Sequence, residues 1–256
     1  MRQTTEPVLT GKRILITRPA EQAAPLATLI QQAGGEAVVF PAIEIAEPAN
    51  LPALKSVIAR LLQFDRAIFI SPTAVARAFH YLDHWPAGLS VAAIGAGSAR
   101  ALQRAGVQNI LVPEQGQDSE ALLALPEMQQ VNGLRIVIFR GEGGRELLAD
   151  VLRERGAQVE YAECYRRIKP QADIAPLLSQ HLDAIVVTSR EGLQNLRELL
   201  GEHWPRFQKQ AFFVPHPRIG DAANALGIAQ TITTIGGDVG YVEALSRFFR
   251  TNPGAV

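Results

Sequence analysis

The segment FDRAIFISPTAVARAFHYL (64–82) decides the fold, because within it a short apolar strand passes directly into a helix. The strand is predicted at 66–71, and Ser71 and Pro72 then provide the signals with which helices begin. The same order of signals returns at LDAIVVTSREGL (182–193). Strands that lead straight into helices, repeated along a chain, predict parallel sheets covered on both faces. The predicted fold class is α/β.

Two further pairs of segments repeat along the chain. GKRILITRP (11–19) resembles GLRIVIFRG (133–141), and residues 91–107 have a fainter echo in residues 212–228. An offset of roughly 120 residues is far longer than a solenoid period, so it indicates two similar domains. Further strands are predicted at 13–17, 37–40, 90–95, 109–113, 135–140, 158–165, 183–189, 210–215 and 230–235.

Two extended segments that contain proline separate the predicted domains. PAIEIAEP (41–48) begins and ends with proline, and YRRIKP (165–170) ends with it. Proline disfavours a helix and suits an extended crossing. We therefore predict a discontinuous first domain, residues 1–46 with 171–256, and an inserted second domain, residues 47–170. A simple division near residue 130 is the alternative that composition leaves open.

The composition excludes several classes of protein. Lys+Arg and Asp+Glu are both 25, and a chain without positive excess is a poor candidate for general nucleic-acid binding. The single cysteine, Cys164, permits no intrachain disulfide or multi-cysteine metal site, and we expect it to be a buried small hydrophobe. The start MRQTTEPVLTGKR has no apolar stretch, and no run approaches the roughly 20 residues that span a bilayer. We expect a cytoplasmic protein without a metal.

Several strands end in a small or hydroxylated residue just where a helix begins. Ligands of open α/β sheets bind at the carboxyl ends of the strands, where free N–H groups of helix N-termini suit carboxylates or phosphates. Each serine can instead be only a helix cap, and each arginine only a solvated charge. The candidate anion-binding side chains are Arg18, Ser71, Ser98, Arg140, Ser189 and Arg190.

Two further features point to chemistry. Gly95-Ala96-Gly97 is a partial dinucleotide fingerprint, but Arg100 stands where its third glycine belongs. Tyr161 and Tyr165 lie four residues apart, so a regular strand would place both on one face. Tyr165 lies closest to the interdomain crossing and is our candidate catalytic residue, although packing is the commoner fate of a tyrosine.

The motifs together resemble the uroporphyrinogen-III synthase family across nearly the whole chain. They occur in the order ITRP (16–19), PAIEI (41–45), FISPTAV (69–75), AIGAGSARAL (93–102), RGEGGRELLADVLRERGAQVEYAECYRR (140–167) and VVTSREGL (186–193). The resemblance implies two flavodoxin-like domains joined by a two-stranded linker. It also implies a cofactor-free lyase of porphyrin and heme biosynthesis that closes hydroxymethylbilane into uroporphyrinogen III and inverts the last pyrrole through a spiro intermediate.

The resemblance also implies roles for residues. Tyr165 would donate a proton to the departing hydroxyl; Ser71, Ser98 and Ser189 match hydroxylated or turn positions that line the substrate site, and Arg18 and Arg140 lie beside such turns. Pro217-Arg218-Ile219 departs from the family, where threonine pairs are frequent. A monomer is expected, with hydroxymethylbilane synthase as a transient partner. The alternatives are a dinucleotide-dependent oxidoreductase and a non-catalytic two-domain protein that binds a small anion.

Overall fold

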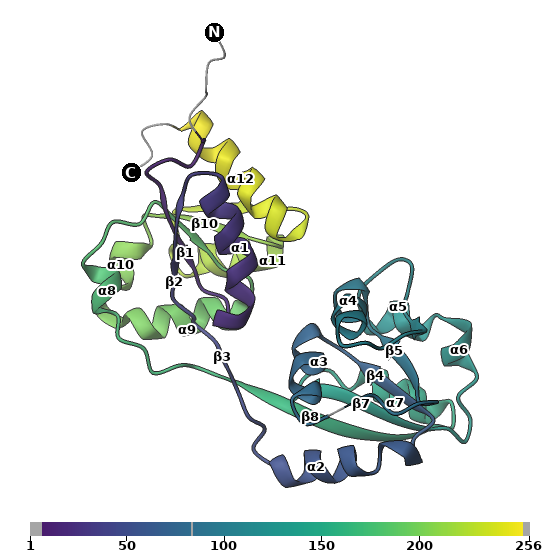
Figure 1. The fold of residues 1–256 in the computed structure, drawn as a ribbon. Coiled ribbons are helices and arrows are strands. Elements are labelled where there is room, and N and C mark those ends of the chain that lie inside the picture. Colours follow the sequence, from purple (N-terminus) through teal and green to yellow (C-terminus); the bar gives the residue numbers. More distant parts are fainter. Residues whose placement is uncertain (1–6, 83, 253–256) are drawn as a thin grey trace. The chain divides into compact units, whose positions relative to one another are not determined.

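The computed structural model describes residues 7–82 and 84–252 (Figure 1). The chain divides into two compact units: unit 1 is Met1–Glu44 with Ile168–Val256, and unit 2 is Ile45–Arg167. The boundaries that we predict from the sequence fall within three residues of these divisions. The chain passes from one unit to the other in β3 (Glu44–Ala46) and near the end of β8 (Gln158–Ile168). β8 neighbours β3 in the sheet of unit 2.

Unit 1 contains a five-stranded sheet of order β11-β10-β9-β1-β2 with parallel pairing throughout. Read from β2, the chain order is 2-1-3-4-5, the order of flavodoxin-like folds. Its strands are β1 (Arg13–Ile16), β2 (Glu36–Val39), β9 (Ala184–Val186), β10 (Ala211–Val214) and β11 (Gln230–Thr233).

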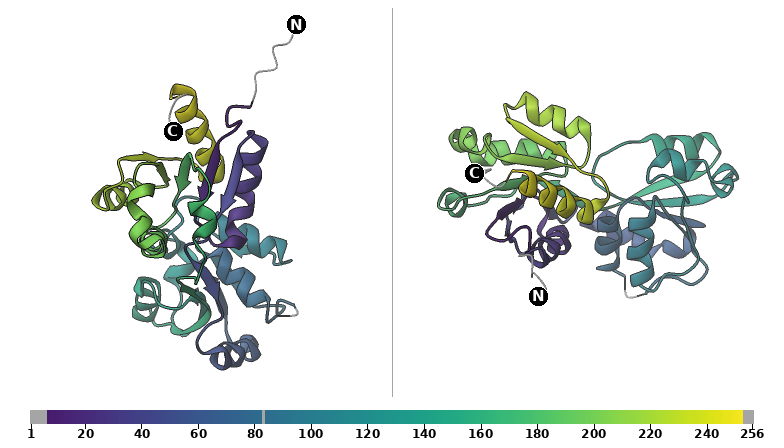
Figure 2. Two further views of the ribbon diagram at one scale, coloured as in Figure 1. Left: turned by 90° about the vertical axis from the view of Figure 1, so that its left-hand side faces the viewer. Right: turned by 90° about the horizontal axis from the view of Figure 1, so that it is seen from above.

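Helices cover both faces of this sheet, as Figure 2 shows from two further sides. α1 (Ala20–Gln32) and α12 (Gly237–Thr251) bury one core, with Leu26 and Tyr241 among its members. The helices on the opposite face are α8 (Ala175–Leu178), α9 (Arg190–Leu200), α10 (Trp204–Phe207) and α11 (Pro217–Ala225), with a 3₁₀ turn at Gly201–His203. Strands that are buried on both faces need apolar residues at every position, which explains the unbroken AFFV of β10.

Unit 2 contains a six-stranded sheet of order β3-β8-β7-β4-β5-β6, and the five strands from β8 to β6 pair in parallel. Its remaining strands are β4 (Arg66–Phe69), β5 (Ser90–Ala93), β6 (Ile110–Leu111) and β7 (Arg135–Gly141). Its helices are α2 (Leu51–Ala59), α3 (Pro72–Phe79), α4 (Ala96–Arg104), α5 (Ser119–Leu123), α6 (Pro126–Gln129) and α7 (Leu147–Glu154), with a 3₁₀ turn at Leu61–Gln63.

Successive residues of β4 show which helices lie on which face of this sheet. Ile68 belongs to the core formed with α5, α6 and α7. Phe69 points the other way and lies 6.3 Å, between ring centroids, from Phe79 of α3. α3 in turn packs against α4. The helices that follow β4 and β7 therefore cover opposite faces.

The two units share one arrangement of five parallel strands, but the chain begins at a different strand of that arrangement in each unit. Taken from β7, the strands β7, β8, β4, β5 and β6 occupy the sheet positions of β1, β2, β9, β10 and β11. The backbone N–H of Arg13 donates to Asp183 (2.8 Å), and that of Arg135 donates to Asp65 (2.7 Å). The repeated segments of the sequence thus occupy equivalent places, and unit 2 is a circular permutation of the unit 1 order.

Cys164 is fully buried in β8, as the sequence predicts. Burial raises the pKa of its thiol to about 12, so almost none is thiolate at neutral pH. We expect iodoacetamide to leave Cys164 unmodified in the folded protein at pH 7.5 and to alkylate it fully in denaturant, as mass spectrometry would show. Rapid alkylation without denaturant would contradict this burial.

Among the described residues, no helix is long and apolar enough to cross a membrane. Within the same part of the chain, no group of three or more histidine, cysteine, aspartate or glutamate residues is arranged to hold a metal ion.

Candidate active site

The candidate site of unit 2 lies where β4 and β7 run side by side. Because the helices after these strands cover opposite faces, their carboxyl ends form a topological switch point, the usual ligand crevice of an open α/β sheet. Ser71 follows β4 and Gly141 ends β7. Tyr165, on the neighbouring strand β8, pairs with Gly141. The candidate catalytic tyrosine is therefore at the switch point.

A β-bulge aims the Tyr165 side chain. Glu163 pairs with Arg140, but the next pair joins Tyr165 to Gly141, so β8 contains one extra residue there. Tyr161 pairs with Ile138, three residues before Gly141, which places the two tyrosines on opposite faces. The prediction that they share a face is wrong, because it assumed a regular strand.

The hydroxyl of Tyr165 lies 3.3 Å from Oγ of Ser71, and either group can donate. Tyr165 is only 3% exposed, whereas Ser71 is partly exposed. Ser71 also caps α3, since its Oγ accepts the N–H of Ala74 at 3.0 Å. The sequence left open whether Ser71 is a helix cap or a site residue. It is a cap that also contacts Tyr165, the candidate proton donor.

Gly141 leaves room for the Tyr165 ring. A Cβ at this position would lie 2.7 Å from Cε2 and Cζ of Tyr165, closer than side chains tolerate. The N–H of Glu142 donates to the carbonyl of Tyr165 at 2.8 Å, which fixes the tyrosine backbone to the same turn. The guanidinium of Arg167 lies 5.8 Å from the centroid of the phenol ring. The sequence alone gave no sign of this steric role of Gly141.

Arg140 holds this glycine-rich turn from inside. It is 2% exposed, and its guanidinium donates to the carbonyls of Gly141 (3.3 Å) and Gly143 and to the Glu146 carboxylate (3.0 Å). Tyr161 donates to the same carboxylate, and the centroid of its ring lies 4.5 Å from the Arg140 guanidinium. These internal partners indicate that Arg140 positions the turn, where the sequence suggested direct contact with a substrate carboxylate.

The same contacts change the pKa values of Glu146 and Tyr161, the two side chains that contact Arg140. The hydrogen bond from Tyr161, with Arg140 close by, lowers the pKa of Glu146. Burial, followed by the bond to Glu146, raises the pKa of Tyr161. A carboxyl whose pKa falls on folding stabilises the fold above its unfolded pKa and ceases to do so as the pH falls through its folded value. The network is therefore complete at neutral pH.

Ser98 is not a helix cap. Gly95 occupies the cap position of α4, and Ser98 is the third residue of the helix and 2% exposed. The capping alternative is wrong at this position, because the helix begins earlier than the serine suggests. Ser98 does lie in the first turn of α4, the helix that follows β5, but little of it is accessible to a ligand.

Unit 1 has an equivalent switch point between β1 and β9. Ser189 caps α9, with Oγ accepting the N–H of Gly192 at 2.9 Å, and therefore matches Ser71. Arg190, the first residue of that helix, is exposed. Arg18 follows β1, pairs with Asp238 and lies 5.2 Å from the ring centroid of Tyr241. Of these candidates, Arg190 is the cation most accessible to an anionic ligand.

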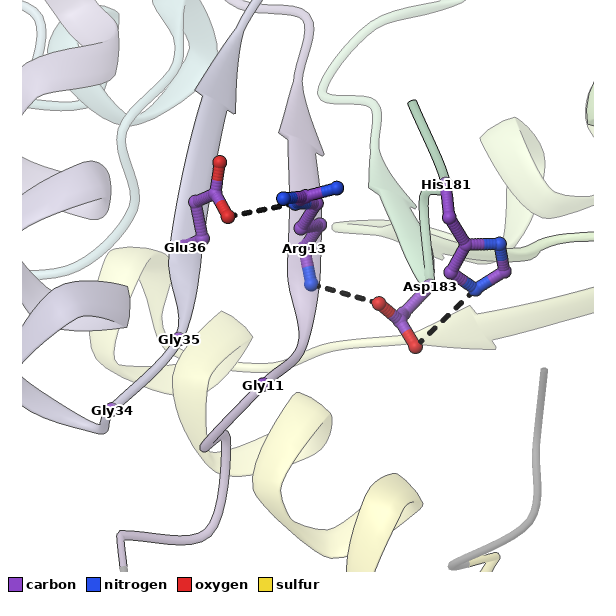
Figure 3. A pocket seen from close by; sticks show the side chains of 7 residues that line it. All are labelled: Gly11, Arg13, Gly34, Gly35, Glu36, His181 and Asp183. Atoms are coloured by element: carbon purple, nitrogen blue, oxygen red, sulfur yellow. Dashed lines mark hydrogen bonds and ion pairs between the residues drawn. The ribbon is translucent and has the colours of Figure 1, made fainter. Parts of the chain in front are cut away.

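A pocket of about 370 Å³ lies at the amino ends of the unit 1 strands, opposite to the end that carries the switch point (Figure 3). Its charged groups are paired internally, since Arg13 donates to Glu36 at 2.7 Å and Asp183 lies 3.7 Å from Nε2 of His181. This pocket lies at the amino ends of β1 and β2, whereas ligands of such sheets bind at the carboxyl ends. It therefore lies at the end of this sheet opposite to Arg18, Ser189 and Arg190, the unit 1 candidates.

The fold and site define a two-unit, doubly wound α/β protein with a phenol beside a capping serine at the switch point of one sheet. Residues 24–234 match the family model described as uroporphyrinogen-III synthase HemD. The uroporphyrinogen-III synthase of Escherichia coli K12 is 39% identical over 203 residues, 75% of this chain and 82% of the relative. That of Salmonella typhimurium LT2 is 37% identical over 226 residues, 84% of this chain and 91% of the relative. The chain belongs to the uroporphyrinogen-III synthase family, whose members are cyclising lyases of porphyrin biosynthesis.

Solved structures agree on the fold. A mutant uroporphyrinogen III synthase from the extremely thermophilic bacterium Thermus thermophilus superimposes with a TM-score of 0.60 at 19% identity, over 95% of this chain and 99% of the other. The enzyme from Helicobacter pylori 26695 gives 0.58 at 14% identity, over 94% and 99%. Family membership leaves the alternatives from the sequence, an oxidoreductase or a non-catalytic anion-binding protein, without support.

Proposed function

We propose that this chain closes hydroxymethylbilane into uroporphyrinogen III and that Tyr165 supplies the proton with which the substrate hydroxyl leaves as water. Loss of water gives an azafulvene on ring A, which the substituted carbon of ring D attacks. The resulting spiro intermediate breaks and closes again with ring D reversed. The chain must assist the departure of the hydroxyl and hold the ends so that the unrearranged type I ring does not form first.

The observation that supports Tyr165 most strongly is its placement. Its phenol lies at the switch point of unit 2 and has a hydroxyl partner, Ser71, at 3.3 Å. A phenol O–H at this position can donate to a departing oxygen. Positioning and electrostatics supply the rest of such a cyclisation. Separating the type I and type III porphyrin isomers made from hydroxymethylbilane tests the activity itself.

The substrate carries an acetate and a propionate on each pyrrole, so it needs many carboxylate contacts. Arg190 and the N–H groups at the start of α9 are our candidates in unit 1, and the first turn of α3 is the candidate in unit 2. Arg18, Arg140 and Ser98 would act by holding the surrounding turns, because Arg18 and Arg140 have internal partners and Ser98 is buried. An unchanged KM in Arg190→Gln would remove Arg190 from this role.

We also infer a cytoplasmic monomer that meets hydroxymethylbilane synthase transiently. The substrate cyclises spontaneously to the type I ring, so a short transfer from the enzyme that makes it favours the type III product. Balanced charge, with Lys+Arg and Asp+Glu both at 25, gives no reason to expect nucleic-acid binding. Light scattering after size-exclusion chromatography checks the monomer, and a dimer mass would contradict it.

A further inference from the structure

Ser71 has a hydrogen-bonding capacity that its known contacts do not fill. A serine hydroxyl offers one proton and two acceptor positions. One acceptor position takes the N–H of Ala74 at 3.0 Å, and the other can take the hydroxyl of Tyr165 at 3.3 Å. With both acceptor positions used, the proton of Ser71 is available to a third group.

Exposure decides which of the two hydroxyls a substrate meets first. Tyr165 is 3% exposed, enclosed by Gly141, Ser71 and Arg167, whereas Ser71 is partly exposed at the start of α3. The long Oη–Oγ distance suits a contact that tightens when the reacting complex forms. A proton from Tyr165 thus has a short route outward through Ser71.

We propose that Ser71 is a catalytic residue that relays the Tyr165 proton to the departing hydroxyl of hydroxymethylbilane. This proposal rests on the proposed role of Tyr165 and assigns the direct contact to a second hydroxyl. Ser71 therefore does more than cap α3 or bind a substrate carboxylate.

The step balances in atoms and charge. The nitrogen of ring A supplies the electron pair that expels the oxygen, the C–O bond breaks, and the oxygen takes the Ser71 proton and leaves as water. Ser71 takes the proton of Tyr165, so the negative charge rests on the phenolate while ring A is a protonated azafulvene. When ring D has formed its new bond and regains aromaticity, it releases one proton, which returns through Ser71 to Tyr165.

The test separates capping from proton transfer by substitution at Ser71. Ser71→Asn keeps a good helix cap but offers no proton that can be transferred, since asparagine caps about as well as serine. We expect kcat to fall by about 10²-fold or more, with KM changed by less than about threefold. Ser71→Thr keeps both cap and hydroxyl, so we expect it to restore most of the rate.

Two controls make the result independent of folding. Ser71→Ala and Asn50→Ala each remove a cap from a helix of unit 2, since Asn50 accepts the N–H of Ala53 at 3.1 Å. Only Ser71→Ala should lose activity at matched thermal stability. In Tyr165→Phe, adding Ser71→Asn should cause no further loss, because two members of one relay act as a unit.

The possible failures are distinct. Wild-type kcat in Ser71→Asn, with a large loss in Tyr165→Phe, would overturn the relay and leave Tyr165 as the direct donor. Additive losses in the double variant would also overturn the relay, because the two residues would then act independently. Wild-type kcat in Tyr165→Phe would overturn the proposed role of Tyr165 itself.

Discussion

Replacing Tyr165 by phenylalanine is expected to lower kcat by about 10²- to 10⁴-fold, the usual contribution of a positioned general acid. Only the hydroxyl is removed, so the ring still fills the space beside Gly141 and the fold should be retained. KM should change little, because the proton moves only in the reaction step and not in binding. Steady-state kinetics with hydroxymethylbilane generated in situ measure both constants.

Tyr81→Phe is a matched control for this substitution. Tyr81 lies in the same unit and donates to Glu47 at 2.9 Å, outside the candidate site. Loss of that hydroxyl should leave kcat and KM unchanged. Equal activity of Tyr165→Phe and Tyr81→Phe would show that the Tyr165 hydroxyl takes no part in the reaction.

Gly141→Ala is the second substitution with a large expected effect. The new Cβ would lie 2.7 Å from two ring carbons of Tyr165 and 3.1 Å from its hydroxyl oxygen, so the ring must move away from Ser71. Overpacking of this kind costs about 1–3 kcal/mol. We expect kcat to fall by more than about tenfold, since displacements of about 1 Å reduce rates by up to 10². Kinetics and urea denaturation measure the two effects.

The control for this substitution is Gly220→Ala in α11 of unit 1. A Cβ at Gly220 would lie 3.7 Å from its nearest neighbours, an ordinary contact. Alanine also favours helix over glycine by about 1 kcal/mol, so stability should be unchanged or higher. Should Gly141→Ala keep wild-type kcat, the packing of Tyr165 on Gly141 would not matter for catalysis.

The strands were predictable because their burial leaves a strong signal. AIF in β4 and AFFV in β10 are apolar at every position, as strands covered on both faces must be. Ser71 and Ser189 were likewise readable as helix starts, and both cap their helices. The repeat in the sequence predicted two related units, and their equivalent strand positions explain it.

The details of the site were not predictable for physical reasons. The bulge that aims Tyr165 depends on pairing with a different strand, and nothing in ECYRR itself indicates an extra residue. Arg140 reads like any strand-end arginine, but the turn after it folds back over the guanidinium and makes it internal. The alternative that Ser98 caps a helix was wrong because Gly95, three residues earlier, is the N-cap of α4. Contacts between distant segments decided each of these cases.

The most direct test uses the wild-type protein and the identity of its product. Hydroxymethylbilane is generated in situ, the protein is added, and the oxidised porphyrins are separated into type I and type III isomers. We predict mainly the type III isomer, formed faster than the spontaneous type I ring. Type I product alone, at the rate of the protein-free control, would contradict the proposed activity of this chain.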